Sequence, residues 1–306
     1  MGSRGTRRLT GLTILVGLVT GLLVATLTAA PLIERRTIYV TALDVNGRPV
    51  PLLNADDFRV KEDGRVKKVV QAQPATEVMH IALLLDDGGP SLAAMRQATG
   101  QFVERLQRKA EFSLTTTAGQ PQARVRLTAD PREIYNGLLG TFANSAPTTQ
   151  FLDALLESVR NHISRKAVRP VIVAIVSEGE QLSSLRATVV LDALQQSGAM
   201  FYYIGLGMPV TTGTRPPPGS FRAADSTESE AVQRNTVVGS GPKNSGGRSE
   251  QVLLPNGIEP LMLSFAAELA GQYAVTYETY ANRARLEVTT SRPGVRLRAP
   301  LRVGGK

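Results

Sequence analysis

Three short runs of nearly unbroken apolar residues constrain the fold of this chain more than any other feature. They cover residues 78–85, 171–176 and 200–206. Runs of this length and composition are typical of strands that are buried on both faces of a parallel sheet. Segments with helical periodicity lie between them, at 92–106, 151–163 and 185–195. Because buried strands alternate with amphipathic helices, the sequence predicts an α/β fold with a doubly wound, mostly parallel sheet.

The two flanks of this region have a different pattern. Residues 31–77 and 272–306 contain short segments with alternating apolar and polar residues, separated by turn residues such as Asp63-Gly64. We therefore expect the α/β domain to cover residues 78–271. We also expect the N- and C-terminal flanks to pack together as one small antiparallel β unit.

Residues 208–252 interrupt the α/β pattern. They are rich in Gly, Ser, Thr, Pro and Arg, include Pro216-Pro217-Pro218, and show no apolar periodicity. This composition predicts a disordered insertion at the surface.

The first thirty residues have the pattern of an export signal. Arg4, Arg7 and Arg8 precede an apolar run at 9–27, and small residues follow it. The run is long for a cleaved signal, so 1–30 is predicted to be a signal peptide or a signal anchor, with residues 9–30 available for membrane anchoring. In either case the remainder is expected to be exported, and to be periplasmic, secreted or anchored to the inner membrane facing outward.

Composition argues against several functions. The chain has no cysteine, which excludes disulfides, thiol nucleophiles and Cys-ligated zinc. Its formal net charge is +9, but the basic residues are scattered, aromatic residues make up only 5% and Trp is absent. A nucleic-acid surface combines a basic stripe with stacking platforms, so no nucleic-acid partner is expected.

The order of segments that follow the buried strands resembles a known domain. Residues 83–86 are followed by Thr149 with residues 151–155, then by 173–176 with 177–180, and then by 201–207. This order resembles a von Willebrand factor type A (VWFA) domain. Flanking segments at 39–50, 55–64 and 292–296 resemble exported bacterial VWFA-related proteins. The resemblance covers about residues 35–303 apart from 208–252, and it implies an exported protein-interaction module of the binding or adhesion type.

The resemblance also implies where a metal ion would bind. Such domains hold a divalent cation with Asp-x-Ser-x-Ser in a first loop, a Thr in a second and an Asp in a third. Here Asp86 is followed by Gly88 and Pro90, which carry no side-chain oxygen, and Glu178 stands where a shorter Asp is expected. A register shifted by one residue gives Asp87, Gly89 and Ser91 instead.

We therefore expect a degenerate metal site and no cofactor, with weak binding of Mg²⁺ or another divalent cation left open. The degenerate metal site would comprise Asp86, Ser91, Thr149 and Glu178. A rim that binds a protein partner would comprise Asp87, Gly88, Thr148 and Glu180.

No enzyme signature is evident, and the chain is expected not to be an enzyme. Only two histidines occur: His80 lies in an apolar strand, where a core role is expected, and His162 lies near a helix C-terminus, where a cation is favourable. No Gly-x-Ser-x-Gly elbow or phosphate-binding loop follows a strand. Two alternatives stay open: a hydrolase on a doubly wound sheet, and a basic envelope protein that binds anionic polymer through 208–252.

Overall fold

The computed structural model describes residues 34–145, 148–177, 179–207, 223–280 and 283–303. Residues Ile33–Lys306 form one compact unit. The predicted export signal at 1–30 lies outside the described residues. Within the described ranges, no helix is both long enough and apolar enough to cross a membrane.

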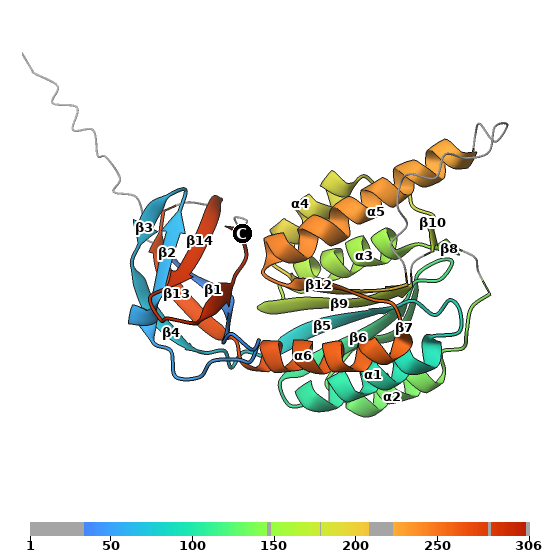
Figure 1. Cartoon of the computed structure of the whole chain (residues 1–306), viewed down its shortest axis with the longest axis horizontal. Helices are drawn as coiled ribbons and strands as arrows, with labels where there is room; N and C mark the ends of the chain where they lie inside the picture. The colour runs from blue at the N-terminus through green and yellow to red at the C-terminus, as the bar shows by residue number, and fades with distance from the viewer. Residues whose placement is uncertain (1–33, 146–147, 178, 208–222, 281–282, 304–306) are drawn as a thin grey trace, which may run out of the picture. The chain divides into compact units, whose positions relative to one another are not determined.

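A six-stranded sheet forms the centre of this unit (Figure 1). Its order is β12-β11-β9-β5-β6-β7, and only the edge strand β7 runs antiparallel to its neighbour. The strands are β5 (Met79–Leu85), β6 (Ala110–Thr116), β7 (Gln122–Thr128), β9 (Arg169–Ser177), β11 (Met200–Leu206) and β12 (Arg248–Val252). The three apolar runs form β5, β9 and β11, which lie side by side in the middle of the sheet, where both of their faces are covered.

Helices cover both faces of the sheet, as predicted. In Figure 1, α1, α2 and α6 lie on one face and α3, α4 and α5 on the other. Their bounds are α1 (Leu92–Leu106), α2 (Pro131–Leu139), α3 (Phe151–Ser164), α4 (Ala187–Ser197), α5 (Ala223–Ser245) and α6 (Ile258–Ala270). Alternate residues of each central strand belong to two separate apolar clusters, one on each face. The predicted doubly wound, mostly parallel α/β sheet is confirmed.

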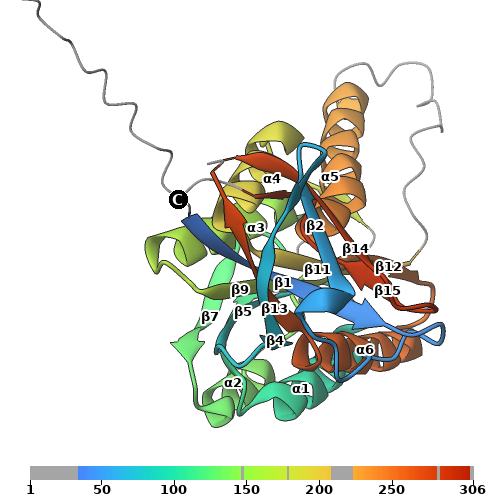
Figure 2. The same cartoon turned by 90° about the vertical axis from the view of Figure 1, so that its left-hand side faces the viewer.

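The two flanks meet in a small β unit, which is also confirmed. One antiparallel sheet has the order β15-β1-β13-β4 and the other β16-β14-β2-β3. Figure 2 faces this unit and shows β1 beside β13. Strands from the N-terminal flank pair directly with strands from the C-terminal flank, so both sheets of the unit need both flanks. Its strands are β1 (Glu34–Leu43), β2 (Phe58–Glu62), β3 (Arg65–Lys67), β4 (Val69–Pro74), β13 (Tyr273–Thr279), β14 (Ala284–Thr290), β15 (Arg296–Arg298) and β16 (Arg302–Val303).

The predicted disordered insertion is wrong over its C-terminal part. Residues 223–245 form helix α5, and 248–252 form edge strand β12; residues 208–222 lie outside the described residues. The glycines permit close packing here. A Cβ on Gly241 would lie 3.2 Å from the ring of Phe201, and one on Gly247 would lie 1.9 Å from the Phe201 carbonyl oxygen. The small residues that suggested a loop are therefore what lets α5 and β12 approach β11.

The two histidines also differ from expectation. His162 is buried, and its Nε2 lies 3.2 Å from the Val171 carbonyl oxygen. Burial lowers the pKa of His162 to about 4, so the ring is neutral at pH 7 and is not the expected cation at the helix C-terminus. The side chain of the neighbouring Ile163 is exposed, whereas that of His162 is buried. His80 is not a core residue: its side chain is 25% exposed, with Nε2 3.6 Å from Glu111.

Arg169 ties the β unit to the amino end of the parallel sheet. Its Nη2 donates to the Leu269 carbonyl (2.6 Å) and to Gln272 Oε1 (2.8 Å). The guanidinium lies 5.2 Å from the ring centroid of Tyr39 in β1. Gln272 in turn donates to Thr41 Oγ1 of the same strand (3.1 Å). This buried contact leaves the opposite, carboxyl end of the sheet free of the β unit.

Candidate functional site

The loops predicted to carry function collect at the carboxyl end of the sheet. Strand register places the last residues of β5, β9, β11 and β12 level with one another: Leu85 pairs with Ile175, and Leu206 pairs with Ser177 and Val252. Two short parallel strands, β8 (Thr148–Thr149) and β10 (Glu180–Gln181), join the second loop to the third. Open parallel sheets bind ligands at this end.

Asp86 leaves β5 at the centre of this end and is 4% exposed. Its Oδ1 accepts a hydrogen bond from the Gly88 backbone N–H (3.0 Å), and its Oδ2 accepts one from the Ser177 N–H at the end of β9 (3.0 Å). Burial raises the pKa of Asp86, against the lowering effect of these two N–H groups. One oxygen of this carboxylate therefore stabilises the turn of the first loop, and the other holds that loop to the end of β9.

Asp87 faces a different loop. It is fully buried, and its Oδ1 accepts from the Ala118 N–H (3.1 Å) just after β6. Its Oδ2 lies 3.5 Å from Nη2 of Arg124 on β7, and its backbone carbonyl accepts from the Asn144 N–H (2.8 Å). The predicted rim carboxylate is thus an internal support for two loops, not a surface group.

Thr149 is buried and turned inward. Its hydroxyl donates to the Thr117 carbonyl (3.0 Å) and lies 3.1 Å from the Thr117 hydroxyl. Thr148 is partly buried, and its carbonyl accepts from the Gly119 N–H (2.8 Å). The second loop is therefore fastened to the loop that follows β6, and the Thr149 hydroxyl is engaged away from Asp86.

The remaining predicted residues do not add ligands to this set. Gly88 is partly buried, and its backbone N–H donates a hydrogen bond to the Asp86 carboxylate. Ser91 is the N-terminal cap residue of α1, but its side chain makes no capping hydrogen bond. Because Ser91 takes that position, neither Asp86 nor Asp87 caps the helix. Glu178 lies outside the described residues, as does the side chain of Glu180.

These groups do not fit a VWFA-type cation site. A hard cation needs several oxygen ligands with free lone pairs directed at one point. The Asp86 carboxylate already accepts two backbone N–H groups, the Thr149 hydroxyl donates to a carbonyl, and Gly88 and Pro90 supply no side-chain oxygen. Among the described residues, no group of three or more His, Asp or Glu side chains could hold a metal.

Apolar side chains surround this end of the sheet, and sequence reasoning missed them. Leu182 follows β10, and its N–H donates to the Thr149 carbonyl (2.9 Å). Phe142 precedes the segment at Asn144 that is bound to Asp87, and Leu253-Leu254 follow β12 directly. Their exposure ranges from 51% for Leu182 to 77% for Phe142. The apolar rim comprises Leu139, Phe142, Leu182, Leu253 and Leu254. The sequence did contain a signal for this rim: large apolar residues occur at or just after the ends of helices and strands, outside any helical or strand periodicity.

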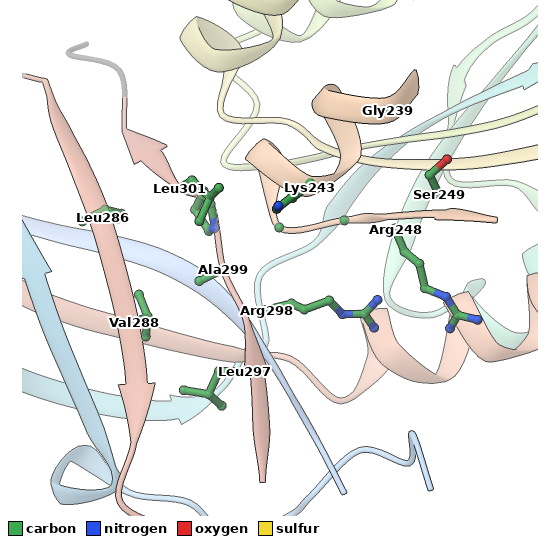
Figure 3. A pocket seen from close by; sticks show the side chains of 13 residues that line it. Gly239, Lys243, Arg248, Ser249, Leu286, Val288, Leu297, Arg298, Ala299 and Leu301 are labelled. Atoms are coloured by element: carbon green, nitrogen blue, oxygen red, sulfur yellow. The ribbon is translucent and has the colours of Figure 1, made fainter. Parts of the chain in front are cut away.

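A hollow of about 500 Å³ lies elsewhere, between the start of β12 and strands β14 and β15 (Figure 3). Arg248 and Arg298 line it, and Figure 3 shows both guanidinium groups beside α6. There the carboxylate of Glu268, 1% exposed, pairs with both: its Oε1 lies 2.7 Å from Arg248 Nη1, and its Oε2 contacts Arg298 Nη2. The Glu268 carboxylate therefore supplies a counter-charge to both arginines of this hollow.

Among known proteins, this chain is similar only to proteins found by comparison with solved structures. No family model matches the chain, and no curated protein matches it. A von Willebrand factor type A protein from Catenulispora acidiphila is 12% identical, with a TM-score of 0.46, over 90% of this chain and 74% of that one. The von Willebrand factor domain of a type V pilus tip protein from Porphyromonas gingivalis is 10% identical, with a TM-score of 0.43, over 63% and 95%.

Proximal thread matrix protein 1 from the mussel byssus is 14% identical with a TM-score of 0.48. The structure compared has zinc in its MIDAS motif, the metal-ion-dependent adhesion site. That match covers 71% of this chain and 50% of the mussel protein, so the chain spans about half the length of that relative. Two of these three proteins are von Willebrand factor domains by name. This is the domain that the sequence resembles. At these values the similarity concerns the fold and carries nothing about function.

Proposed function

We propose that this chain is an exported, non-catalytic protein-interaction module whose partner docks on the apolar rim without a bridging metal ion. One observation carries the proposal: the Asp86 carboxylate and the Thr149 hydroxyl are used internally, while the side chains of the apolar rim around them are exposed. Asp86 and Thr149 direct their oxygens at backbone groups of neighbouring loops. Phe142 and Leu182 remain available to a partner.

This arrangement suits a protein partner better than a small molecule. The core of a protein–protein interface is depleted of charged residues and enriched in aromatic ones, and the apolar rim contributes Phe142 to such a core. The supporting loops are held by hydrogen bonds between 2.8 and 3.1 Å, which makes the rim preorganised and lowers the entropic cost of binding. The N-terminal pattern at 1–30 supports export, so the partner would be met outside the cytoplasm.

The hydrolase alternative lacks support at the same place. A hydrolytic site needs a nucleophile within reach of a base. The chain has two histidines, and both contact the amino-end half of the molecule: His162 contacts Val171 at the start of β9, and His80 is the second residue of β5. No enzymatic activity is therefore proposed.

Site-specific photo-crosslinking in the native cell tests the rim as the docking surface. A photoreactive amino acid at Phe142 or at Leu182 should each capture the same protein. The same residue at Val66, which is 75% exposed on the β unit, is the matched control and should not capture it. Capture of one partner from both rim positions, retained when EDTA is added, is the expected result.

Two outcomes would overturn the proposal. Capture from Val66 alone would move the docking surface to the β unit. Loss of the rim crosslinks in EDTA, with recovery on Mg²⁺, would show that a metal ion completes the site after all.

A further inference from the structure

A groove beside the β unit has three arginines and two aspartates in its lining, which leaves an excess of positive charge. It has a volume of about 420 Å³ and lies between α4 and the strands β14 and β16. Three arginines line it: Arg283 directly before β14, Arg285 in β14, and Arg302 in β16. The other lining side chains that can bind a ligand are Asp63, Asp192, Gln195 and Gln196.

Strand register forces two of these arginines together. Arg285 and Arg302 are directly opposite each other in the antiparallel pair β14–β16, and both are exposed. Residues in this position have Cβ atoms about 4.5–5.5 Å apart, and like charges there destabilise the sheet. The buried neighbours Ala284 and Leu286 fix which face of β14 turns outward, so Arg285 cannot turn to the other face without exposing them.

The nearby carboxylates do not pair with these guanidinium groups. Asp63 Oδ1 accepts from the backbone N–H of Arg285 (3.0 Å), which commits it to holding the turn. In the part of the chain that the structure describes, Arg283, Arg285 and Arg302 form no side-chain ion pair within 4.0 Å. The hollow of Figure 3 is the opposite case, because Glu268 lies between its two arginines.

We propose that this groove binds a phosphate group. An arginine guanidinium holds a phosphate through two parallel N–H···O bonds, and two neighbouring arginines can share one phosphate. The side-chain amides of Gln195 and Gln196 on α4 add neutral donors at the opposite wall. The ligand replaces the repulsion between Arg285 and Arg302 with a shared counter-charge. The groove is larger than one phosphate needs, so the ligand carries its phosphate on a larger body.

This site is independent of the proposed function. It lies on β14, β16 and α4, whereas the apolar rim lies on the loops after β10, β12 and α2. It also lies outside residues 208–252, through which the alternative of a protein that binds anionic polymer would act.

Calorimetric titration of the full chain with inorganic pyrophosphate at low ionic strength tests the proposal. The double variant Arg285→Gln/Arg302→Gln should lose about tenfold or more in affinity. Arg59→Gln is the control: it removes one positive charge from an exposed position on the same sheet, outside the groove, and should change the affinity by less than about twofold. Arg302→Lys keeps the charge but removes the fork and should fall between the two.

A second measurement separates binding from a structural role. Without ligand, the melting temperature of Arg302→Gln should equal or exceed that of the wild type, because one repulsive charge is gone. A clear decrease would assign Arg302 a structural role and overturn the proposal. Equal pyrophosphate affinity in the double variant and the wild type, or no binding by the wild type, would overturn it too.

Co-sedimentation with phosphatidylglycerol vesicles identifies the source of the phosphate. Sedimentation that pyrophosphate competes away, and that the double variant lacks, assigns a lipid headgroup. Pyrophosphate binding without sedimentation assigns a soluble phosphate. Either result supports the site.

Discussion

The two ends of the parallel sheet use buried carboxylates in different ways. At the carboxyl end, Asp86 and Asp87 accept hydrogen bonds from the backbone N–H groups of Gly88, Ser177 and Ala118. At the amino end, Glu268 is held between the guanidinium groups of two arginines. Backbone donors belong to the fold itself, whereas guanidinium groups are side chains that one substitution can remove.

This difference separates the proposed docking surface from a structural joint. Hydrogen bonds from backbone N–H groups to Asp86 and Asp87 hold the loops at the carboxyl end, and the side chains of the apolar rim are exposed around them. The amino end joins α6, β12 and β15 through ion pairs, and Arg169 adds the link to β1. The comparison predicts large stability effects at the amino end, moderate ones at the carboxyl end, and none from metal ions.

Removing the carboxylate of Glu268 should have the largest effect. Glu268→Ala leaves Arg248 and Arg298 without their shared counter-charge, and breaking a buried pair in this way costs about 3–5 kcal/mol. Urea unfolding would measure the loss. Glu250→Ala is the control, because Glu250 pairs with the same Arg248 but its side chain is 36% exposed. If both variants lose the same stability, the amino end is not the ion-paired joint described above.

Asp86→Ala tests the carboxyl end and should cost about 2–4 kcal/mol, because it leaves two N–H groups without an acceptor. Part of the loss is offset, since burial disfavours the charged carboxylate. Ser91→Ala removes another predicted ligand that makes no capping hydrogen bond, and should change the free energy of unfolding by less than about 0.5 kcal/mol. Equal losses in the two variants would contradict the supporting role of Asp86.

The pH dependence of stability should identify His162 at the amino end. Its pKa falls from 6.5 in the unfolded chain to about 4 in the folded one, so between these values the unfolded state binds more protons. Stability is therefore complete above pH 6.5 and decreases toward pH 4, by about 2 kcal/mol at pH 5. Unfolding at pH 7 and pH 5 measures this. His162→Gln should remove that share of the decrease, and an unchanged pH profile in the variant would count against a buried neutral ring.

Divalent cations should have the smallest effect. Addition of 1 mM Mg²⁺ or Mn²⁺ should leave the melting temperature unchanged, because the Asp86 and Thr149 oxygens are already engaged. A micromolar site would instead stabilise the folded state by about 4 kcal/mol under these conditions. Calorimetry with the same ions is a direct check. Micromolar affinity that Asp86→Ala abolishes would show that the loops rearrange around a metal.

The sequence predicted the fold better than the site. Three apolar runs and the helices between them were sufficient to predict the parallel sheet. A strand that is buried on both faces has apolar residues at nearly every position, so its sequence is easy to recognise. The same reasoning placed Asp86 correctly at the end of β5. It did not show where the carboxylate points, because the Ser177 N–H that holds it lies 91 residues further along the chain. Composition failed at 223–252, where glycine signalled close packing against β11 instead of a loop.

The sequence alone determined the alternation of strands and helices, the β character of the two flanks, and the absence of side-chain oxygens at Gly88 and Pro90. These are local properties, set by periodicity and by the chemistry of single residues. The tertiary structure decided which groups are satisfied. It turned Asp87 and Thr149 inward, left Phe142 and Leu182 exposed, and set Arg285 opposite Arg302. Hydrogen bonds and repulsions between residues far apart in the chain exist only after the strands have found their register.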